Sequence, residues 1–589
     1  MSLTNNTAIA STPMRRRLQK IARIVALLAA VSLASSPAFA GYGADTGKVL
    51  VPAEIGSFTS ESGQAVARQT DGKLVIAGRC GTASGLGFCA ARLNADGSLD
   101  STFNGGLVSP AIPGKVALSL TGELLEQNHS VAIDGNGKIV LAGTCQTGAV
   151  SLVRFCAVRF NTDGSVDSTF NAGGSNGAAA GRVAFGFTSS PIQAFGGMAI
   201  QPSDNKIVFV GRCGSKQCIA RLNVNGDFDS TFAPASAVEG TGRFTFKVTA
   251  SSPERANAVV VDSSGKITVA GSCAADPLDL AKSVCLAKFN ADGTFDTTFG
   301  AGGSGAFRIQ TFTSGTFASL INEDSVALAI DGNKLLLLCK HQFNGADACI
   351  YRFNASNGSL DGSFAATQAL PGKLIFQHPN IGSYEPAALA VDPSSAGRIA
   401  IVGRCADTTS MASDKICAAR ISNAGALDTA FTGPSGNANG GFAYDVGLGL
   451  DLGYAVNVDG GGNVYAVGDC GGKMCVLGFD AIGALNSSAC AANVDADPAI
   501  RATTDGVAII RSMLGLAGTL PGPRGLGFDV DGDGVIDASR DGLIFLRAML
   551  GFKNASINSG ISIATFANRK TWPDLRSYLN TRCGMNLPL

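Results

Sequence analysis

Apolar and polar residues alternate in short runs along most of this chain, and clusters of Gly, Asn and Asp separate the runs. A representative stretch reads "GMAIQ" at 197–201, "PSDN" as a turn, "KIVFVGRC" at 206–213 and "CIARLN" from residue 218. Short runs rich in β-branched residues and bounded by turn residues are typical of β-strands. Other copies show a further run upstream, such as "GKVLV" at 47. The pattern predicts units of four strands, whose third and fourth members are "KIVFVGRC" and "CIARLN".

The unit recurs seven times, and the first cysteines of the copies lie 60 to 68 residues apart. Four-stranded units in series favour a β-propeller, in which each unit forms one blade of a ring. A closed ring leaves only short edges exposed, whereas a flat sheet of so many strands would curl or split. An open β-solenoid is the alternative, although its coils usually have shorter periods. We therefore expect an all-β, seven-bladed propeller over residues 41–489.

The sequence "QTDGKLVIAG", followed by "ARLNADGSLDSTF", resembles the bacterial delta-60 repeat. The likeness extends over roughly residues 47–486 and is most specific in the copies that end at Phe103, Phe170, Phe232 and Phe299. It weakens in "ISNAGALDTAF" and "GFDAIGALNSS", as terminal repeats often do. The resemblance implies an exported propeller and brings no catalytic residues with it.

Each copy carries one cysteine at the end of a strand and one at the start of the next, with 4 to 11 residues between them. A bridge there would clamp the hairpin and contribute roughly 2–3 kcal/mol in the chain-entropy model. A metal site is the alternative, but it needs four convergent ligands, and no second cysteine pair or histidine accompanies these pairs. The expected disulfides are Cys80–Cys89, Cys145–Cys156, Cys213–Cys218, Cys273–Cys285, Cys339–Cys349, Cys405–Cys417 and Cys470–Cys475.

A basic and an acidic residue also recur once per copy. One interpretation is that they hold the turn and pack one blade against the next. The other is that the basic residues form a ring around an anion-binding channel. Both are replaced in the last copy, by Gly478 and Asn486, which favours mutual pairing. The basic residues are Arg92, Arg159, Arg221, Lys288, Arg352 and Arg420, and the acidic ones are Asp100, Asp167, Asp229, Asp296, Asp361 and Asp428.

After residue 490 the pattern changes to two acidic loops, 493–516 and 529–552, each followed by apolar residues at helical spacing. The second reads "DVDGDGVIDASRDGLIFLRAMLGF". Oxygen ligands at alternate positions around a glycine suit Ca²⁺. The expected ligands are Asp529, Asp531, Asp533, Asp537 and Asp541 in the second loop, and Asn493, Asp495, Asp497 and Asp505 in the first.

The two loops resemble a dockerin-type or EF-hand-like calcium module, with a further helix near residues 572–581. The last acidic residue lies at position 13 rather than 12, and Pro498 replaces the turn glycine of the first loop. The resemblance implies Ca²⁺ as the cofactor, a small α-helical dockerin-like domain over 490–589 and a cohesin-like partner. A stabilising cap without a partner is the alternative. Cys490 and Cys583 bracket the module and are expected to bridge its ends.

Residues 1–40 have the pattern of a signal peptide, with a basic start, an apolar run and the small residues "SSPAFA" before a cleavage site at Ala40. The apolar run is too short for a permanent membrane anchor. No later segment reaches about 18 uninterrupted apolar residues, the length that a membrane span needs. Sixteen cysteines suit an oxidising compartment. We expect a protein that is secreted, periplasmic or at the cell surface, with no membrane span.

Removal of the leader leaves 40 basic and 45 acidic residues, a net charge of −5. Nucleic-acid binding needs a strongly basic face, so this class of function is not expected.

Few residues suggest catalysis. The three histidines lie in different copies and are expected at the surface. Five glutamates break the repeat and are expected in solvated loops. These residues are His129, His341, His378, Glu123, Glu126, Glu239, Glu254 and Glu323.

The segments that differ between copies should cluster on one face as a ligand surface, namely 110–130, 188–196, 310–325 and 376–387. The expected function is extracellular binding or scaffolding of a glycan or protein, with the calcium module used for docking or stabilisation. The alternative is a secreted polysaccharide hydrolase or lyase with its active site in the propeller.

Overall fold

The computed structural model describes residues 48–51, 61–82, 85–94, 97–104, 112–118, 123–147, 152–174, 177–188, 193–233, 239–250, 253–274, 282–300, 302–309, 322–342, 346–378, 383–394, 397–406, 414–431, 433, 440–446, 450–479, 530, 539–563, 571–582 and 587. The expected signal peptide and the 490–583 disulfide lie outside these residues. None of the described helices is long and apolar enough to cross a membrane.

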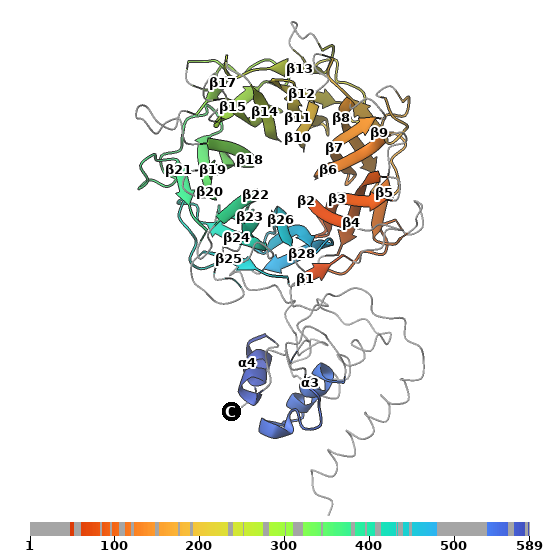
Figure 1. Ribbon diagram of the computed structural model, residues 1–589, viewed down its shortest axis with the longest axis vertical. Coiled ribbons are helices and arrows are strands. Elements are labelled where there is room, and N and C mark those ends of the chain that lie inside the picture. Colours follow the sequence, from red (N-terminus) through yellow and green to blue (C-terminus); the bar gives the residue numbers. More distant parts are fainter. Residues whose placement is uncertain are drawn as a thin grey trace, which may run out of the picture. The chain divides into compact units, whose positions relative to one another are not determined.

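Seven antiparallel four-stranded sheets form a ring, which confirms the seven-bladed propeller (Figure 1). The first strand of each sheet lies nearest the centre (Figure 1). The first strands of blades 1 to 7 are β2 (Glu61–Arg68), β6 (Glu123–Ile133), β10 (Gln193–Ile200), β14 (Glu254–Val261), β18 (Asn322–Asp331), β22 (Ser383–Val391) and β26 (Asp451–Val458). The second strands are β3 (Leu74–Thr82), β7 (Ile139–Thr147), β11 (Ile207–Cys213), β15 (Ile267–Ala274), β19 (Lys334–Gln342), β23 (Ile399–Ala406) and β27 (Val464–Cys470).

The third and fourth strands complete each sheet toward the outside of the ring. The third strands are β4 (Gly85–Leu93), β8 (Leu152–Phe160), β12 (Lys216–Leu222), β16 (Lys282–Phe289), β20 (Ala346–Asn354), β24 (Lys415–Ile421) and β28 (Met474–Phe479). The fourth strands are β5 (Lys115–Leu118), β9 (Arg182–Phe185), β13 (Arg243–Phe246), β17 (Ala306–Arg308), β21 (Lys373–Phe376), β25 (Gly441–Tyr444) and, in blade 7, β1 (Lys48–Leu50).

The blade is offset by one strand from the repeat that the sequence shows. The upstream run of each copy was expected to be the first strand of its own blade, but it forms the fourth strand of the preceding blade. "KIVFVGRC" and "CIARLN" therefore lie in the second and third strands of blade 3 rather than the third and fourth. The offset leaves blade 7 one strand short at its end. Strand β1 completes it by pairing with β28, Val49 opposite Val476, and so closes the ring.

The hydrophobic core lies between the blades. Ile207 and Phe209 of β11 pack with blade 2, whereas Val208 and Val210 of the same strand pack with blade 4. A second strand is thus buried on both faces, which explains its continuous apolar run. Corresponding clusters fill all the remaining interfaces around the ring, including the one between blades 7 and 1.

The described C-terminal part contains two helices, α3 (Asp541–Met549) and α4 (Trp572–Arg582), and the short 3-10 helix η2 (Asn554–Ser556). Helix α3 follows the second acidic loop, and α4 lies where the further helix was expected. Their apolar residues form a small core of their own that includes Val530, Phe545, Trp572 and Leu579. The first acidic loop and the helix expected after it lie outside the described residues.

Candidate functional site

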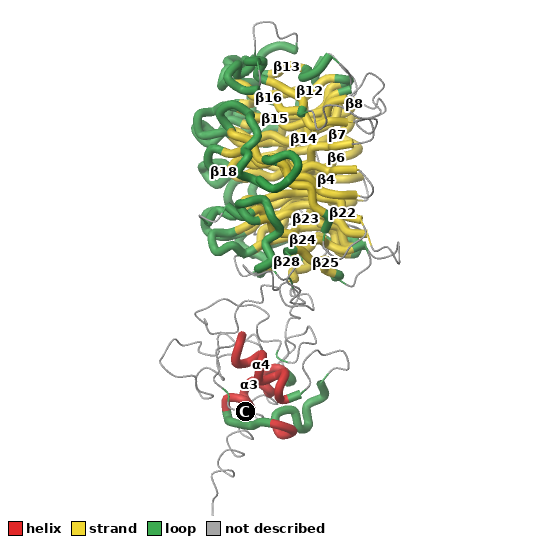
Figure 2. The backbone as a smooth tube through the Cα atoms, turned by 90° about the vertical axis from the view of Figure 1, so that its left-hand side faces the viewer, coloured by secondary structure: helices red, strands yellow, loops and turns green. Residues whose placement is uncertain are grey.

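The topology gives the ring two chemically different faces. In every blade the first strand begins, and the second strand ends, at the same face. Both the hairpins between second and third strands and the connections between blades therefore lie on that face, which we call the disulfide face. The turns between first and second strands and those after the third strand lie on the opposite face, the turn face. Figure 2 views the ring edge-on, with the described turns gathered at one side of the strands.

All seven expected cysteine pairs within the repeats are joined at the disulfide face, with Cα–Cα distances of 4.9 to 6.0 Å. In six blades the bridge is diagonal, because the residue opposite the second cysteine is a glycine two positions before the first. Gly403, for example, lies opposite Cys417. A Cβ on Gly403 would lie 2.1 Å from the carbonyl oxygen of Glu385. The first strand is too close for a side chain there.

Blade 5 departs from this arrangement. Cys339 occupies the position of the glycine and lies directly opposite Cys349, with the shortest Cα–Cα distance of the seven bridges, 4.9 Å. His341 takes the position that the first cysteine holds in the other six blades, opposite the start of the first strand. Alignment on the cysteines alone hides this shift of two residues.

The repeated basic and acidic residues lie toward the turn face and are buried there. Arg159 Nε contacts Asp167 Oδ2 at 2.6 Å, and its guanidinium lies 4.5 Å from the centre of the Phe170 ring. The same side chain donates to the carbonyl oxygen of Val224 in blade 3. Lys138 adds a second ion pair to Asp167, at 2.7 Å. The corresponding basic residues of the six blades are only 2 to 7% exposed.

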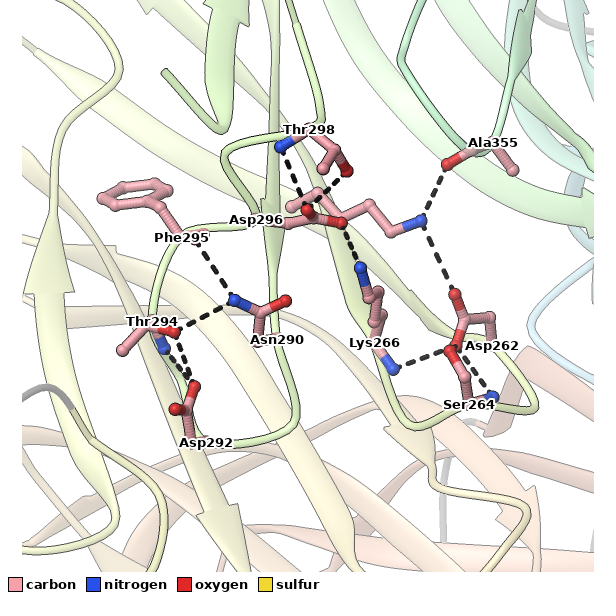
Figure 3. Close-up of polar contacts among 11 residues, drawn as sticks. Asp262, Ser264, Lys266, Asn290, Asp292, Thr294, Phe295, Asp296, Thr298 and Ala355 are labelled. Atoms are coloured by element: carbon pink, nitrogen blue, oxygen red, sulfur yellow. Dashed lines mark hydrogen bonds and ion pairs between the residues drawn. The ribbon is translucent and has the colours of Figure 1, made fainter. Parts of the chain in front are cut away.

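Blade 4 has a lysine, Lys288, in place of the arginine. Figure 3 shows the polar contacts of Asp262 and Asp296 in this blade. Lys288 Nζ donates to the carbonyl oxygen of Ala355 in blade 5 at 2.7 Å and lies 3.5 Å from Asp262 Oδ2. Asp296 is held by Lys266 at 2.8 Å and by the hydroxyl of Thr298 at 2.6 Å. The geometry matches the interpretation that these residues hold the turn and join neighbouring blades. It does not match an open anion-binding ring, because the cations are buried and bonded within the fold.

These contacts set the pKa of the repeated aspartates. Burial by itself raises the pKa of Asp229, but hydrogen bonds from Thr231 and the positive charges of Lys206 and Arg221 lower it to about 2. Asp100 has the same surroundings, and its pKa is also lowered to about 2. The carboxylates of Asp100 and Asp229 are therefore ionised in the folded protein at neutral pH.

Three of the five glutamates that were interpreted as breaking the repeat, Glu126, Glu254 and Glu323, occupy a repeated position, so the interpretation is wrong for these three. In every blade a residue with a polar group, at or near the start of the first strand, lies opposite the first cysteine, or opposite His341 in blade 5. The shared position lies 18 to 21 residues before that cysteine or histidine, a signal that varying connection lengths obscure. Its members are Glu61, Glu126, Gln193, Glu254, Glu323, Tyr384 and Asp451.

Three of these side chains, those of Gln193, Glu254 and Asp451, bind the connection that leads into their own strand. Glu254 accepts hydrogen bonds from the backbone N–H groups of Val248 and Thr249 at 2.8 and 2.7 Å. Asp451 accepts from the N–H of Val446 at 2.5 Å. Glu239, on a different segment, accepts from the N–H of Thr188 at 2.6 Å. The expectation of solvated loop residues is therefore wrong for Glu239, Glu254 and Glu323, which are 1 to 3% exposed. The side chains of Glu123 and Glu126 lie outside the described residues.

In blade 5 the shared position belongs to a cluster of four ionisable groups. Glu323 Oε1 lies 2.8 Å from His341 Nδ1 and 2.5 Å from Lys373 Nζ, and Oε2 accepts from the Tyr351 hydroxyl at 2.7 Å. Burial raises the pKa of Glu323, but the bond to His341 and the charge of Lys373 bring it below its usual value. Burial also raises the pKa of Tyr351, and it lowers that of Lys373. All four side chains are at most 5% exposed, so the cluster is a closed internal network.

Two of the three histidines are buried, contrary to the expected surface positions. His341 is 5% exposed, and His378 is 3% exposed beside the ring of Tyr384. The side chain of His129 lies outside the described residues. Each buried histidine is close to cysteine sulfur, but those cysteines are joined in the 339–349 and 405–417 disulfides. They cannot supply the thiolates that a structural zinc site uses.

Of the nine expected calcium ligands, the structure describes only Asp541. It is the first residue of α3 and is fully buried, and its Oδ1 accepts the backbone N–H of Val530 at 2.6 Å. This bond joins the two ends of the second acidic loop. A carboxylate in the first turn of a helix also interacts favourably with the helix dipole. The other eight residues lie outside the described part of the chain.

Four segments of the chain match a family model described as "Domain of unknown function (DUF5122) beta-propeller", residues 69–103, 135–170, 203–232 and 263–299. Each match runs from the turn before a second strand to the repeated Phe, at Phe103, Phe170, Phe232 or Phe299. No curated protein matches the chain. With the seven blades, the family match supports a β-propeller repeat protein.

Several solved structures are similar in fold, at low sequence identity. Polysaccharide lyase Uly1 is 10% identical and has a TM-score of 0.36, with 71% of this chain and 90% of that chain covered. A PL25 ulvan lyase is 9% identical with a TM-score of 0.37, covering 72% and 94%. Drosophila Semaphorin 2a is 8% identical with a TM-score of 0.39, covering 72% and 75%. These likenesses concern the fold alone.

Proposed function

We propose that this chain is an exported binding or scaffold protein whose disulfide face contacts an extracellular glycan or protein. The observation that carries the proposal is the arrangement of the connections. Segments that differ between copies in length and sequence share one face, and a disulfide holds the base of every hairpin on it. Variable loops on a rigid scaffold are the usual location of binding residues. The bridges also suit the oxidising compartment that the leader-like start predicts.

A binding screen of the mature chain, residues 41–589, against immobilised polysaccharides and secreted proteins tests this proposal. Ligands are then compared on two variants with exposed side chains. Lys216→Ala lies on the disulfide face, and Asn136→Ala lies on the turn face. We expect binding to respond to changes on the disulfide face and to be unaffected by Asn136→Ala. A ligand that responds only to the turn face contradicts the assignment.

We also propose that the C-terminal module binds Ca²⁺ through Asp529, Asp531, Asp533, Asp537 and Asp541, with a weaker site at Asn493, Asp495, Asp497 and Asp505. The hydrogen bond between Asp541 and Val530 supports the proposal because it joins the two ends of the acidic segment that contains the other expected ligands. When bound, the ion would supply charge neutralisation and rigidity rather than a reaction step. The residues of this chain would hold the ion and order the loop before α3.

Calorimetric Ca²⁺ titration of the mature chain tests the site. Asp531→Ala with Asp533→Ala should abolish the tighter heat signal, and Asp495→Ala with Asp497→Ala should remove only a weaker one. Asp71→Ala, an exposed carboxylate on the propeller, is the matched control and should change neither. Absence of heat from the unaltered protein would end the calcium proposal.

Docking of a cohesin-like partner by this module rests on the calcium site. The mature chain should capture a partner from secreted material with Ca²⁺ present, and lose it with a chelator or in the Asp531→Ala, Asp533→Ala variant. Capture that persists in both conditions would assign the partner to the propeller instead.

The alternative function is hydrolysis or lysis of a polysaccharide, which needs acid and base groups within reach of substrate. Glu239, Glu254 and Glu323 would be the described candidates, but their carboxylates are bonded to groups of the fold. Binding is therefore the function that we propose. Release of reducing or unsaturated ends from any polysaccharide of the screen would overturn it in favour of the enzyme.

A further inference from the structure

Three charged residues hold equivalent positions in three consecutive blades. Arg404, Asp469 and Arg79 each directly precede the first cysteine of blades 6, 7 and 1, at the end of a second strand. Strand β26 contacts β22 and β23 on one side and β2 on the other, and β2 also contacts β27. The three side chains therefore belong to one level of the ring, at the disulfide face.

Tyr454 is the bulged residue of the first strand in blade 7. The pairing of β26 with β27 skips one residue between Gly453 and Ala455, and Tyr454 is that residue. A bulge re-aims the side chain of the extra residue. Asn257 is the corresponding residue of blade 4, and its amide donates to the hydroxyl of Ser272 at 3.1 Å, directly before Cys273. It also donates to the Ser325 carbonyl oxygen of the next blade at 2.8 Å. A bulged side chain thus lies between the pre-cysteine residue and the neighbouring blade.

The electrostatics agree with this placement. Burial and the carboxylate of Asp469 raise the pKa of Tyr454, while the positive charges of Arg79 and Arg404 oppose the rise. Burial likewise raises the pKa of Asp469, and the charge of Arg79 opposes it. Tyr454 therefore lies within electrostatic reach of Asp469, Arg79 and Arg404, and Asp469 lies within reach of Arg79.

The charged side chains of this group differ in how far hydrogen bonds and ion pairs within the protein already occupy them. Asp469 Oδ1 accepts the N–H of Gly472 at 2.7 Å, which fixes the carboxylate beside the short hairpin of blade 7. Arg404 is 45% exposed and is held by Asp414 at 2.7 Å. Arg79 is half-buried and has no ion-pair partner among the residues that the structure describes. One guanidinium is thus available beside an aromatic ring and a fixed carboxylate.

We propose that Arg79, Tyr454 and Asp469, flanked by Arg404, form a binding site for a sugar residue that carries an anionic group, as in acidic polysaccharides. The guanidinium fork matches a carboxylate or a sulfate. The half-buried ring of Tyr454 offers a flat apolar face with a polar edge. An ionised carboxylate is a hydrogen-bond acceptor only, so Asp469 takes hydroxyl donors of the sugar. This site rests on the proposed binding function and gives it a ligand class.

Calorimetry with the mature chain and three matched oligosaccharides tests the site: a galacturonic acid oligomer, its methyl ester and a sulfated galactose oligomer. We expect the acid oligomer to bind at least about tenfold more tightly than its ester, because a charge-assisted pair is lost in the ester. Binding of the sulfated oligomer as well would identify a general anion site, and its failure would identify a carboxylate site. Both results support the proposal.

Variants locate the binding. Arg79→Ala and Tyr454→Ala should each weaken binding about tenfold or more, and Arg79→Lys less, because it keeps the charge and loses the fork. Arg255→Ala removes another exposed cation from the disulfide face, in blade 4, and should change affinity less than about twofold. Circular dichroism confirms that each variant folds, and Arg79→Lys serves if Arg79→Ala does not fold.

Equal losses in Arg79→Ala and Arg255→Ala would indicate diffuse charge attraction and overturn the site. So would failure of both anionic oligomers to bind. If a different glycan or a protein binds the disulfide face, and Arg79→Ala does not change that binding, the proposed sugar site is wrong and the proposed binding function is supported. If ligands of the screen bind only the turn face, both proposals are wrong.

Discussion

A single arginine on the third strand of a blade contacts three parts of the ring at once. Arg159 pairs with Asp167 in its own turn, lies over the ring of Phe170 and donates to the carbonyl oxygen of Val224 in the next blade. One side chain therefore links local turn geometry to packing between blades. Because it is buried, removing it would leave Asp167 as a buried charge with fewer partners.

Arg159→Ala is expected to lower the free energy of unfolding by about 3 kcal/mol, since breaking a buried pair exposes the uncompensated desolvation of its partner. Arg159→Lys should cost clearly less, because Lys288 serves at this position in blade 4. Arg68→Ala, an exposed arginine, is the control and should change stability by less than about 0.5 kcal/mol. Urea unfolding followed by circular dichroism measures all three. Equal stability of Arg159→Ala and the control would contradict the blade-linking role.

The repeated aspartates predict loss of stability in acid. The folded pKa of Asp100 and Asp229 is about 2, below the ordinary value of 3.8. The unfolded chain therefore takes up protons first, and the free energy of unfolding should fall as the pH drops from about 4 to about 2. Asp229→Asn should be less stable at pH 7 and show a shallower decline. A stability that is flat over this range would contradict the pairing.

At the scale of the strands, the close approach of the first and second strands of a blade determines which residue can lie opposite the second cysteine. In five blades a Cβ on the glycine opposite the second cysteine would lie only 1.8 to 2.4 Å from a carbonyl oxygen of the first strand. The diagonal bridge follows, because the first cysteine has to stand two residues further along. Only blade 5 has a side chain there, and it pairs Cys339 directly with Cys349.

Gly403→Ala is expected to destabilise blade 6 by about 1–3 kcal/mol, because its Cβ would meet the Glu385 carbonyl oxygen at 2.1 Å and the backbone would have to shift. Gly87→Ala is the matched control in a third strand, since its Cβ would meet only ordinary contacts at 3.6 Å and beyond. Thermal unfolding of the oxidised proteins compares them. If the two variants unfold at the same temperature, the close approach is not what requires glycine.

Local patterns predicted the strands, the seven cysteine pairs and the number of blades, because each depends on residues close together in the sequence. The offset between repeat and blade could not be predicted this way, since it depends on which distant strand pairs with β28. The position shared by Glu61, Glu254 and Glu323 was missed because the connections before it differ in length. The cluster around Tyr454 depends on a bulge and on three blades, and the sequence carries no local mark of either.

Over the whole molecule, the ring is held by interfaces and closed by one short strand. Each blade shares its core with both neighbours, so no blade is a folding unit with a core of its own. The closing contacts are few. Strand β1 has three residues paired with β28, and Val51 follows them fully buried, with its N–H donated to Met474.

Deletion of residues 41–51 from the mature chain should therefore lower the unfolding temperature and expose the edge of β28, an unpaired edge that favours association. Deletion of residues 41–46 alone keeps β1 and is the control. Size-exclusion chromatography and limited proteolysis compare the two proteins. A monomeric, protease-resistant product of the longer deletion would show that β1 is dispensable.

The position of β1 also determines what an incomplete copy of this protein looks like. A product that stops before Cys475 contains β1 but lacks the residues of β28 that pair with it. Truncation at the carboxyl end thus leaves a strand unpaired at the amino end, more than 400 residues away in sequence. A protease that cleaves unpaired amino-terminal segments would therefore degrade such fragments, although the missing residues are at the carboxyl end.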